Sequence, residues 1–151
     1  MRKNWRSAGS GFFIRSLLFV PGNRADMMEK ARDLPADALI LDLEDSVPPQ
    51  EKDRAREVVS ANLPKMFKEG RPVFVRINPL MSGLTDEDLA AVVSKYVACI
   101  SLPKVEEGID LEALGTKMEW FEGERNIDGR SLAILPWIES PRALRNAYKI
   151  A

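Results

Sequence analysis

Charged side chains stand near the carboxyl ends of several short apolar runs in the sequence. They are Glu44 and Asp45 in ALILDLED, Arg76 in PVFVRIN, Lys104 in ISLPKV and Glu139 in LAILPWIE. Carboxylates are the ligands that hard cations such as Mg²⁺ prefer. A guanidinium offers a planar fork to a carboxylate or an oxo-acid carbonyl. If the carboxyl ends of these runs lie together in the fold, their side chains can bind a cation and an anion.

The chain of 151 residues contains no histidine and one cysteine, Cys99. A Ser-His-Asp or Cys-His catalytic arrangement, a histidine-ligated zinc or haem and an intramolecular disulfide are therefore excluded within it. Acid–base or metal chemistry must use carboxylates, lysine, arginine or backbone groups. Ligation by carboxylates and water indicates Mg²⁺ or Mn²⁺. Cys99 is expected to be a core thiol.

Charge and apolar content exclude other classes of protein. The 22 Lys and Arg against 23 Asp and Glu give a net charge of -1, which argues against a basic nucleic-acid binder or a polybasic membrane adapter. Apolar runs such as SLLFVPG are far shorter than the roughly 20 residues of a membrane span. We expect a cytoplasmic protein. The basic, acid-free first ten residues leave a mitochondrial presequence as the alternative.

Five apolar segments alternate with five helix-like segments. The expected strands are 16–21, 38–45, 72–78, 98–105 and 132–139. The expected helices are 24–33, 50–67, 85–96, 108–123 and 141–151, with Asn23 capping the first and a Thr85-to-Asp88 capping box on the third. Nearly continuous apolar strands suit a parallel sheet that is covered on both faces.

The polar strand ends favour a barrel over an open sheet. In a barrel of parallel strands the carboxyl ends converge on one mouth, where active sites lie. An open doubly wound sheet places its ligand at a single crevice instead. Here four of the five expected strands contribute polar residues. No GxGxxG or GxxxxGK[ST] follows the first strand, so neither a dinucleotide fingerprint nor a phosphate loop is indicated.

Five segments in order carry a resemblance to a known family. They are RSLLFVPGNRADMMEKA, ADALILDLEDSVPPQEKDRAR, PVFVRINPL, ISLPKVE and ILPWIESPRAL. Together they resemble the citrate lyase β-subunit-like proteins of the HpcH/HpaI aldolase superfamily, relatives of malyl-CoA and citramalyl-CoA lyases. The resemblance implies an α/β fold made of the N-terminal five βα units of a (β/α)₈ TIM barrel, which is incomplete. Residues 1–14 would be an N-terminal extension and residues 15–151 a partial lyase domain.

The resemblance also implies a Mg²⁺-dependent carbon–carbon lyase. Its substrate would be a 3-hydroxyacyl-CoA thioester of the citryl-, citramalyl- or malyl-CoA type, cleaved to a 2-oxo acid and acetyl-CoA. A homo-oligomer is expected for a full-length protein, or a lyase complex. This stretch alone is expected to be inactive, because the family's second acidic ligand would lie beyond Ala151. Two alternatives stay open: a truncated, non-catalytic fragment or partner-binding module, and a phosphoenolpyruvate-type enzyme on the same barrel.

The resemblance assigns roles to the acidic and basic strand ends. Glu139 would be a catalytic Mg²⁺ ligand, and Arg76 would bind the substrate, although a structural ion pair of Arg76 with a neighbouring acid is the alternative. The candidates for that ion pair are Asp42, Glu44 and Asp45. Glu44 and Asp45 would form an outer shell that binds metal waters and orients Arg76. Strand alternation predicts that Glu44 and Asp45 point to opposite sides.

Four further cations have two possible roles each. Lys104 could stabilise an oxyanion, or it could pair with an adjacent acid such as Glu106. Arg15, Arg24 and Lys30 flank the first strand and helix, where relatives hold the CoA phosphates. A solvated helix face is the alternative for these three residues.

Overall fold

The computed structural model describes residues 14–67, 71–128 and 131–151. Strands and helices alternate along this chain, as the sequence pattern predicts. The strands are β1 (Leu17–Pro21), β2 (Ala38–Asp42), β3 (Val73–Arg76), β4 (Cys99–Leu102) and β5 (Ala133–Pro136). The α-helices are α1 (Ala25–Arg32), α2 (Lys52–Met66), α3 (Thr85–Val92), α4 (Gly108–Glu124) and α5 (Pro141–Ile150), and the short 3₁₀ segments are η1 (Pro49–Glu51) and η2 (Leu80–Ser82).

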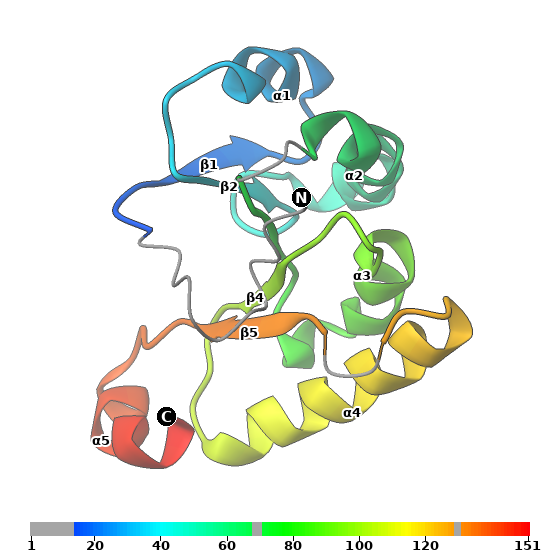
Figure 1. The fold of residues 1–151 in the computed structure, drawn as a ribbon. Helices are drawn as coiled ribbons and strands as arrows, with labels where there is room; N and C mark the ends of the chain where they lie inside the picture. Colours follow the sequence, from blue (N-terminus) through cyan, green and yellow to red (C-terminus); the bar gives the residue numbers. More distant parts are fainter. Residues whose placement is uncertain (1–13, 68–70, 129–130) are drawn as a thin grey trace.

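The strands form one parallel sheet in the order β1-β2-β3-β4-β5. Each strand therefore lies beside the strand that precedes it in the chain. Figure 1 shows the helices following an arc around one side of this sheet, from α1 to α5. Because all strands run the same way, their carboxyl ends lie at one end of the sheet, and the loops that follow them meet there.

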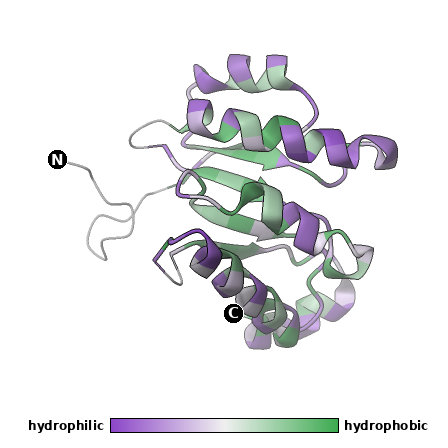
Figure 2. Cartoon of the chain, turned by 90° about the vertical axis from the view of Figure 1, so that its right-hand side faces the viewer, coloured by the Kyte–Doolittle hydropathy of each residue, from purple (hydrophilic) through white to green (hydrophobic). Residues whose placement is uncertain are grey.

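The core lies between the sheet and the surrounding helices. Alternate residues of β3, Val73 and Val75, are fully buried, whereas Phe74 and Arg76 on the opposite face are partly exposed. Val73 and Val75 pack in one apolar cluster with helix residues that include Val59 from α2. In Figure 2 the strands are mostly green, whereas the helices carry much of the purple. In β3 the buried face thus packs against the helices, and the other face is available for polar side chains, whereas every residue of β2 and β4 is buried.

Two further sequence expectations concern the core and the membrane. Cys99 is buried in β4, and this burial raises the pKa of its thiol to about 12, which fits a core thiol. No helix in the part of the chain that the structure describes is long and apolar enough to cross a bilayer.

Two of the predicted helix caps are wrong. The cap position of α1 is Arg24, and the side chain of Asn23 instead donates from Nδ2 to Glu51 Oε2 at 2.7 Å. Thr85 is the first residue inside α3, after a cap position at Leu84 that makes no side-chain bond. The Asn23 side chain is thus engaged by a separate segment, which a local capping motif does not reveal.

The outer edges of β1 and β5 have no neighbouring strand in the sheet that the described residues form. Unpaired backbone groups at a sheet edge are a template for pairing with another chain. We therefore expect the 151-residue chain to self-associate and to elute from a size-exclusion column ahead of a 16.9 kDa monomer. Light scattering on the eluted peak measures the mass. A single monomeric species at every concentration would contradict this expectation.

Candidate functional site

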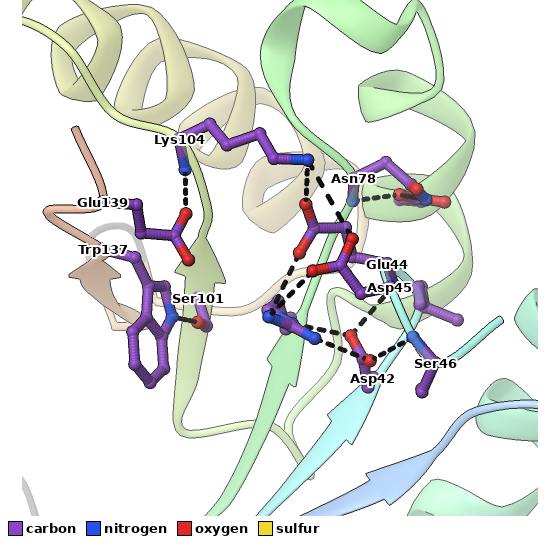
Figure 3. Close-up of polar contacts among 12 residues, drawn as sticks. Asp42, Glu44, Asp45, Ser46, Asn78, Ser101, Lys104, Trp137 and Glu139 are labelled. Atoms are coloured by element: carbon purple, nitrogen blue, oxygen red, sulfur yellow. Dashed lines mark hydrogen bonds and ion pairs between the residues drawn. The ribbon is translucent and has the colours of Figure 1, made fainter.

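The polar residues singled out in the sequence gather at the carboxyl ends of β2 to β5. Figure 3 shows Glu44, Asp45, Lys104 and Glu139 at this end of the sheet, with Asp42 at the end of β2. Arg76 is the last residue of β3 and lies directly beside Asp42 in the strand register. We call this group of residues the mouth cluster. The expected meeting of these strand ends is therefore present in the structure.

A buried ion pair joins Arg76 to Asp42 in the mouth cluster. Arg76 Nε donates to Asp42 Oδ1 at 2.7 Å, and Arg76 Nη2 donates to Asp42 Oδ2 at 2.8 Å. Asp42 is 1% exposed, and it also accepts the backbone N–H groups of Glu44 and Ser46. The guanidinium lies 4.8 Å from the centroid of the Phe19 ring. These contacts fix the plane and direction of the guanidinium before any ligand binds.

Burial by itself would raise the pKa of the Asp42 carboxyl. The hydrogen bonds from Arg76, Ser46 and the Glu44 amide outweigh this effect, so the pKa lies below its ordinary value. Asp42 is therefore an ionised partner for Arg76 at neutral pH. The sequence suggested Asp42 only as one of three possible partners, and the structure shows that it is the bidentate one.

Glu44 lies between the two cations of the mouth cluster. Its carboxylate is 3.1 Å from Arg76 Nη1 and 2.9 Å from Lys104 Nζ, and Glu44 is 4% exposed. Asp45 is exposed but lies 4.0 Å from the same two cations. The prediction that Glu44 and Asp45 point to opposite sides is therefore wrong. The strand conformation ends at Asp42, so the alternation of a strand no longer applies beyond it.

Arg76 retains donors that the mouth cluster does not use. The hydrogen bonds to Asp42 occupy Nε and one N–H of Nη2, and Nη1 forms an ion pair with Glu44 Oε2 at 3.1 Å. No other contact of these two atoms with an acceptor occurs closer than the 4.0 Å approach of Asp45 among the described residues. Each Nη atom carries two N–H groups, so at least one N–H of Nη2 and the N–H groups of Nη1 make no hydrogen bond that the described residues show. Nη1 and Nη2 together form the outer edge of the guanidinium, and the N–H groups of this edge can donate to a carboxylate or an oxo-acid.

Lys104 connects Glu139 to the rest of the mouth cluster. Its backbone N–H donates to Glu139 Oε2 at 2.8 Å, while its Nζ reaches Glu44. The hydrogen bond from Nζ to Glu44 raises the pKa of Lys104. Lys104 therefore pairs with Glu44, and not with the adjacent Glu106 that was the alternative. Glu106 lies 3.9 Å from Arg142 instead.

Two residues that the sequence argument missed support the loop after β2. Lys52 Nζ donates to the carbonyl oxygens of Leu43 and Glu44, at 2.6 Å each. Burial lowers the pKa of Lys52. A Cβ atom on Gly22 would lie 2.5 Å from the carbonyl oxygen of Asp42, so only glycine fits there. Neither contact has a local signature, because each joins segments that are separate in the chain.

A second buried network lies behind the end of β3. Asp88 of α3 is fully buried and accepts from the backbone N–H and the Nδ2 of Asn78, at 2.8 and 2.7 Å. Arg56 of α2 donates to the same carboxylate at 3.1 Å. This network ties α2 and α3 to the segment that follows Arg76. In the sequence, Asp88 suggested a helix cap, which concealed this role.

An aromatic wall flanks the face of the sheet that carries Arg76. Trp137 donates from Nε1 to Ser101 Oγ at 2.5 Å (Figure 3), and its ring lies 5.7 Å from the Phe19 ring. Phe19 also stacks against Arg76. The wall gives the mouth cluster an apolar side, which strengthens electrostatic interactions at the cations.

The three cations assigned to CoA do not gather at the mouth. Arg15 precedes β1 and pairs with Asp37 at 3.0 Å, at the opposite end of the sheet. Arg15 therefore lies apart from Arg24, and the assignment of these three residues to CoA stays a prediction. Arg24 follows β1 at the mouth end and pairs with Asp26, and Lys30 is exposed in the last turn of α1.

The metal-ligating groups at the mouth are few. No group of three or more His, Cys, Asp or Glu residues that could hold a metal ion occurs in the described ranges. Glu139 is exposed, and the described residues give its Oε1 no hydrogen bond, so one carboxylate oxygen can accept a cation. A hard cation that keeps several waters fits one such protein ligand, with low affinity.

Comparison with known proteins agrees with this architecture. Residues 15–151 match the model of the HpcH/HpaI aldolase/citrate lyase family. The citrate lyase subunit beta of Escherichia coli strain K12 is 37% identical over 137 residues, which is 91% of this chain and 45% of that protein. The (3S)-malyl-CoA thioesterase of Cereibacter sphaeroides strain KD131 is 33% identical over 138 residues, again 91% and 45%. The chain thus spans about half the length of these curated relatives.

A solved structure gives the same result. The Mycobacterium tuberculosis citrate lyase beta subunit, complexed with oxaloacetate and magnesium, is 25% identical and superposes with a TM-score of 0.65. The match covers 89% of this chain and 51% of the solved chain. The predicted fold class, consecutive βα units of an incomplete TIM barrel, is confirmed. Sequence, fold and strand-end residues agree, and the chain belongs to the HpcH/HpaI aldolase/citrate lyase family.

Proposed function

We propose that this chain supplies the substrate-binding half of a Mg²⁺-dependent carbon–carbon lyase. The substrate is a 3-hydroxyacyl-CoA thioester of the citryl-, citramalyl- or malyl-CoA type, and the products are a 2-oxo acid and acetyl-CoA. The observation that carries this proposal is the outer edge of Arg76, which is held in place by Asp42 and Glu44. The family, and a relative solved with oxaloacetate and magnesium, support it.

The roles of the residues follow from their contacts. The two outer N–H groups of Arg76 bind the carboxylate or the developing carbonyl of the oxo-acid part. The hydroxyl gives its proton to a general base and becomes that carbonyl as the carbon–carbon bond breaks. The electron pair of this bond passes to the thioester enolate, whose carbon then takes up a proton to give acetyl-CoA. Lys104, 2.9 Å from Glu44, is the nearest additional cation for an anionic oxygen.

Glu139 is the residue of this chain that would hold Mg²⁺. Its Oε2 is fixed by the Lys104 N–H, and its exposed carboxylate suits a hard cation. When bound, Mg²⁺ acts as a Lewis acid and orients the oxo-acid oxygens. Glu44 and Asp45 are already engaged by Arg76 and Lys104, so we assign them to an outer shell. Mn²⁺ is expected to substitute for Mg²⁺.

A hybrid protein tests this function. Residues 15–151 replace the matching segment of the E. coli citrate lyase subunit beta, and release of 2-oxo acid from the three CoA thioesters is measured with Mg²⁺. We expect cleavage of at least one thioester by the folded hybrid, loss of that cleavage in Arg76→Lys, and none with the 151-residue chain alone. A folded hybrid that binds the thioesters without cleaving them would favour a non-catalytic binding module.

A further inference from the structure

Lys104 has an unusual backbone conformation. Its φ angle is 55°, in the left-handed region, and the only other non-glycine residue there among those described is Asn126, with φ of 51°. Asparagine is frequent in this region because its side chain can bond locally, whereas a lysine there is uncommon. Such a conformation persists where surrounding contacts determine it, often at functional sites. At Lys104 the closest contacts are those with Glu139 and Glu44, and Asp45 lies farther away at 4.0 Å.

The two contacts of Lys104 come from different parts of the residue. The backbone N–H donates to Glu139 Oε2, and the side-chain ammonium pairs with Glu44 Oε1. The N–H lies in the peptide plane between Pro103 and Lys104, and φ of Lys104 sets how the following chain runs relative to it; the ammonium does not enter this geometry. Glu139 itself lies on the segment after β5, so the N–H of Lys104 joins the loop after β4 to that segment.

We propose that Lys104 is a positioning residue for Glu139, and that it acts through its left-handed backbone. The N–H fixes Oε2, which leaves Oε1 of the same carboxylate as the oxygen presented to a cation. The ammonium has a separate role, which is to neutralise the buried Glu44 next to Arg76. This inference rests on the proposed function, because it concerns the cation site at Glu139.

Two substitutions separate the backbone role from the charge. Lys104→Gly removes the ammonium and keeps easy access to a positive φ. Lys104→Val removes the same ammonium but disfavours a positive φ, because the side chain is β-branched. Asn126→Gly and Asn126→Val form the matched control pair. They change the same backbone preference at the other left-handed position, after the carboxyl end of α4 and away from the mouth.

Mn²⁺ alone is the probe, and electron paramagnetic resonance of the free ion measures its Kd on the 151-residue chain. We expect Lys104→Gly to bind Mn²⁺ at least as tightly as the unsubstituted chain, because a nearby positive charge is lost. We expect Lys104→Val to bind about 10-fold more weakly than Lys104→Gly, the size of effect seen for outer-shell contacts. The two Asn126 variants should have equal Kd values.

The amide resonance of residue 104 in ¹⁵N-labelled chain is the second readout and needs no metal. In the unsubstituted chain and in Lys104→Gly, hydrogen bonding to a carboxylate should place this amide proton downfield. Glu139→Gln should move it upfield. Circular dichroism shows whether Lys104→Val folds. If it does not fold, these chemical shifts still test the hydrogen bond from the N–H of residue 104 to Glu139.

Three results would overturn the inference. The first is an equal Kd for Mn²⁺ in folded Lys104→Gly and Lys104→Val, and the second is a Kd in Lys104→Gly that is about 10-fold higher than in the unsubstituted chain. The third is an amide proton of residue 104 whose chemical shift does not change in Glu139→Gln. Absence of saturable Mn²⁺ binding by the unsubstituted chain would instead contradict the cation site of the proposed function, and the amide shift would then decide the positioning of Glu139.

Discussion

Glu139→Gln is expected to abolish the Mg²⁺-dependent cleavage by the hybrid protein without unfolding it. Glutamine keeps the shape of the side chain, and its carbonyl oxygen can still accept the Lys104 N–H. It lacks the negative charge that a hard cation requires. Loss of an outer-shell partner costs about 10–100-fold, so loss of a direct ligand should exceed about 100-fold. Release of 2-oxo acid and a thermal melt are the two measurements.

Glu112→Gln is the matched control for this substitution. Glu112 is an exposed residue of α4, so the same change of charge occurs on the helical surface. The control variant should keep the rate of the unsubstituted hybrid. Near-original turnover by Glu139→Gln would show that Glu139 does not bind the metal.

Asp42→Asn has the largest expected effect on stability. Removal of one partner from a buried ion pair costs about 3–5 kcal/mol of unfolding free energy, because the other charge is left uncompensated. Glu44 remains 3.1 Å from Arg76 and offsets part of the loss, so we expect about 3 kcal/mol. Urea denaturation of the unsubstituted chain and of Asp42→Asn measures the difference in unfolding free energy. Asp45→Asn, at an exposed site, should stay within about 0.5 kcal/mol, and equal losses for the two variants would contradict this argument.

The effect of Asp42→Asn should depend on pH. The folded chain holds the pKa of Asp42 below its ordinary value, which is about 3.9 in an unfolded chain. The stabilisation by the carboxylate is therefore fully present above pH of about 4 and is lost as the pH falls through the lower folded-state pKa. The difference in unfolding free energy between the unsubstituted chain and Asp42→Asn should shrink over that acidic range. A difference that stays constant would exclude the charge of Asp42 as its cause.

The sequence predicts the parts of this fold that depend on repeated local patterns. Runs such as ALILD and PVFVR are mostly apolar, and each becomes a strand whose apolar residues are buried in the sheet. The proximity of their polar ends was also predictable, because the carboxyl ends of parallel strands lie at one edge of the sheet. Arg76 and Glu44 could therefore be placed together before the structure was known.

Contacts between distant segments were not predictable in this way. Asn23 and Thr85 have the residue types of helix caps, yet Asn23 donates to Glu51 and Thr85 lies inside α3. Lys52 reaches two backbone carbonyls across a loop, and the left-handed backbone of Lys104 has no sequence signal. Backbone acceptors are present at every residue, so side-chain pattern alone cannot select which of them a lysine will use.

The order of the strands in the sheet, which equals their order in the chain, has a consequence for how the fold is assembled. When a strand leaves the ribosome, the neighbour on which it docks has already been synthesised. The loops to be closed are short, and such local contacts favour rapid folding. The pair of Asp42 with Arg76, 34 residues apart, can form as soon as the third strand docks. Early docking would shield these charges from non-native partners while later units are still being made.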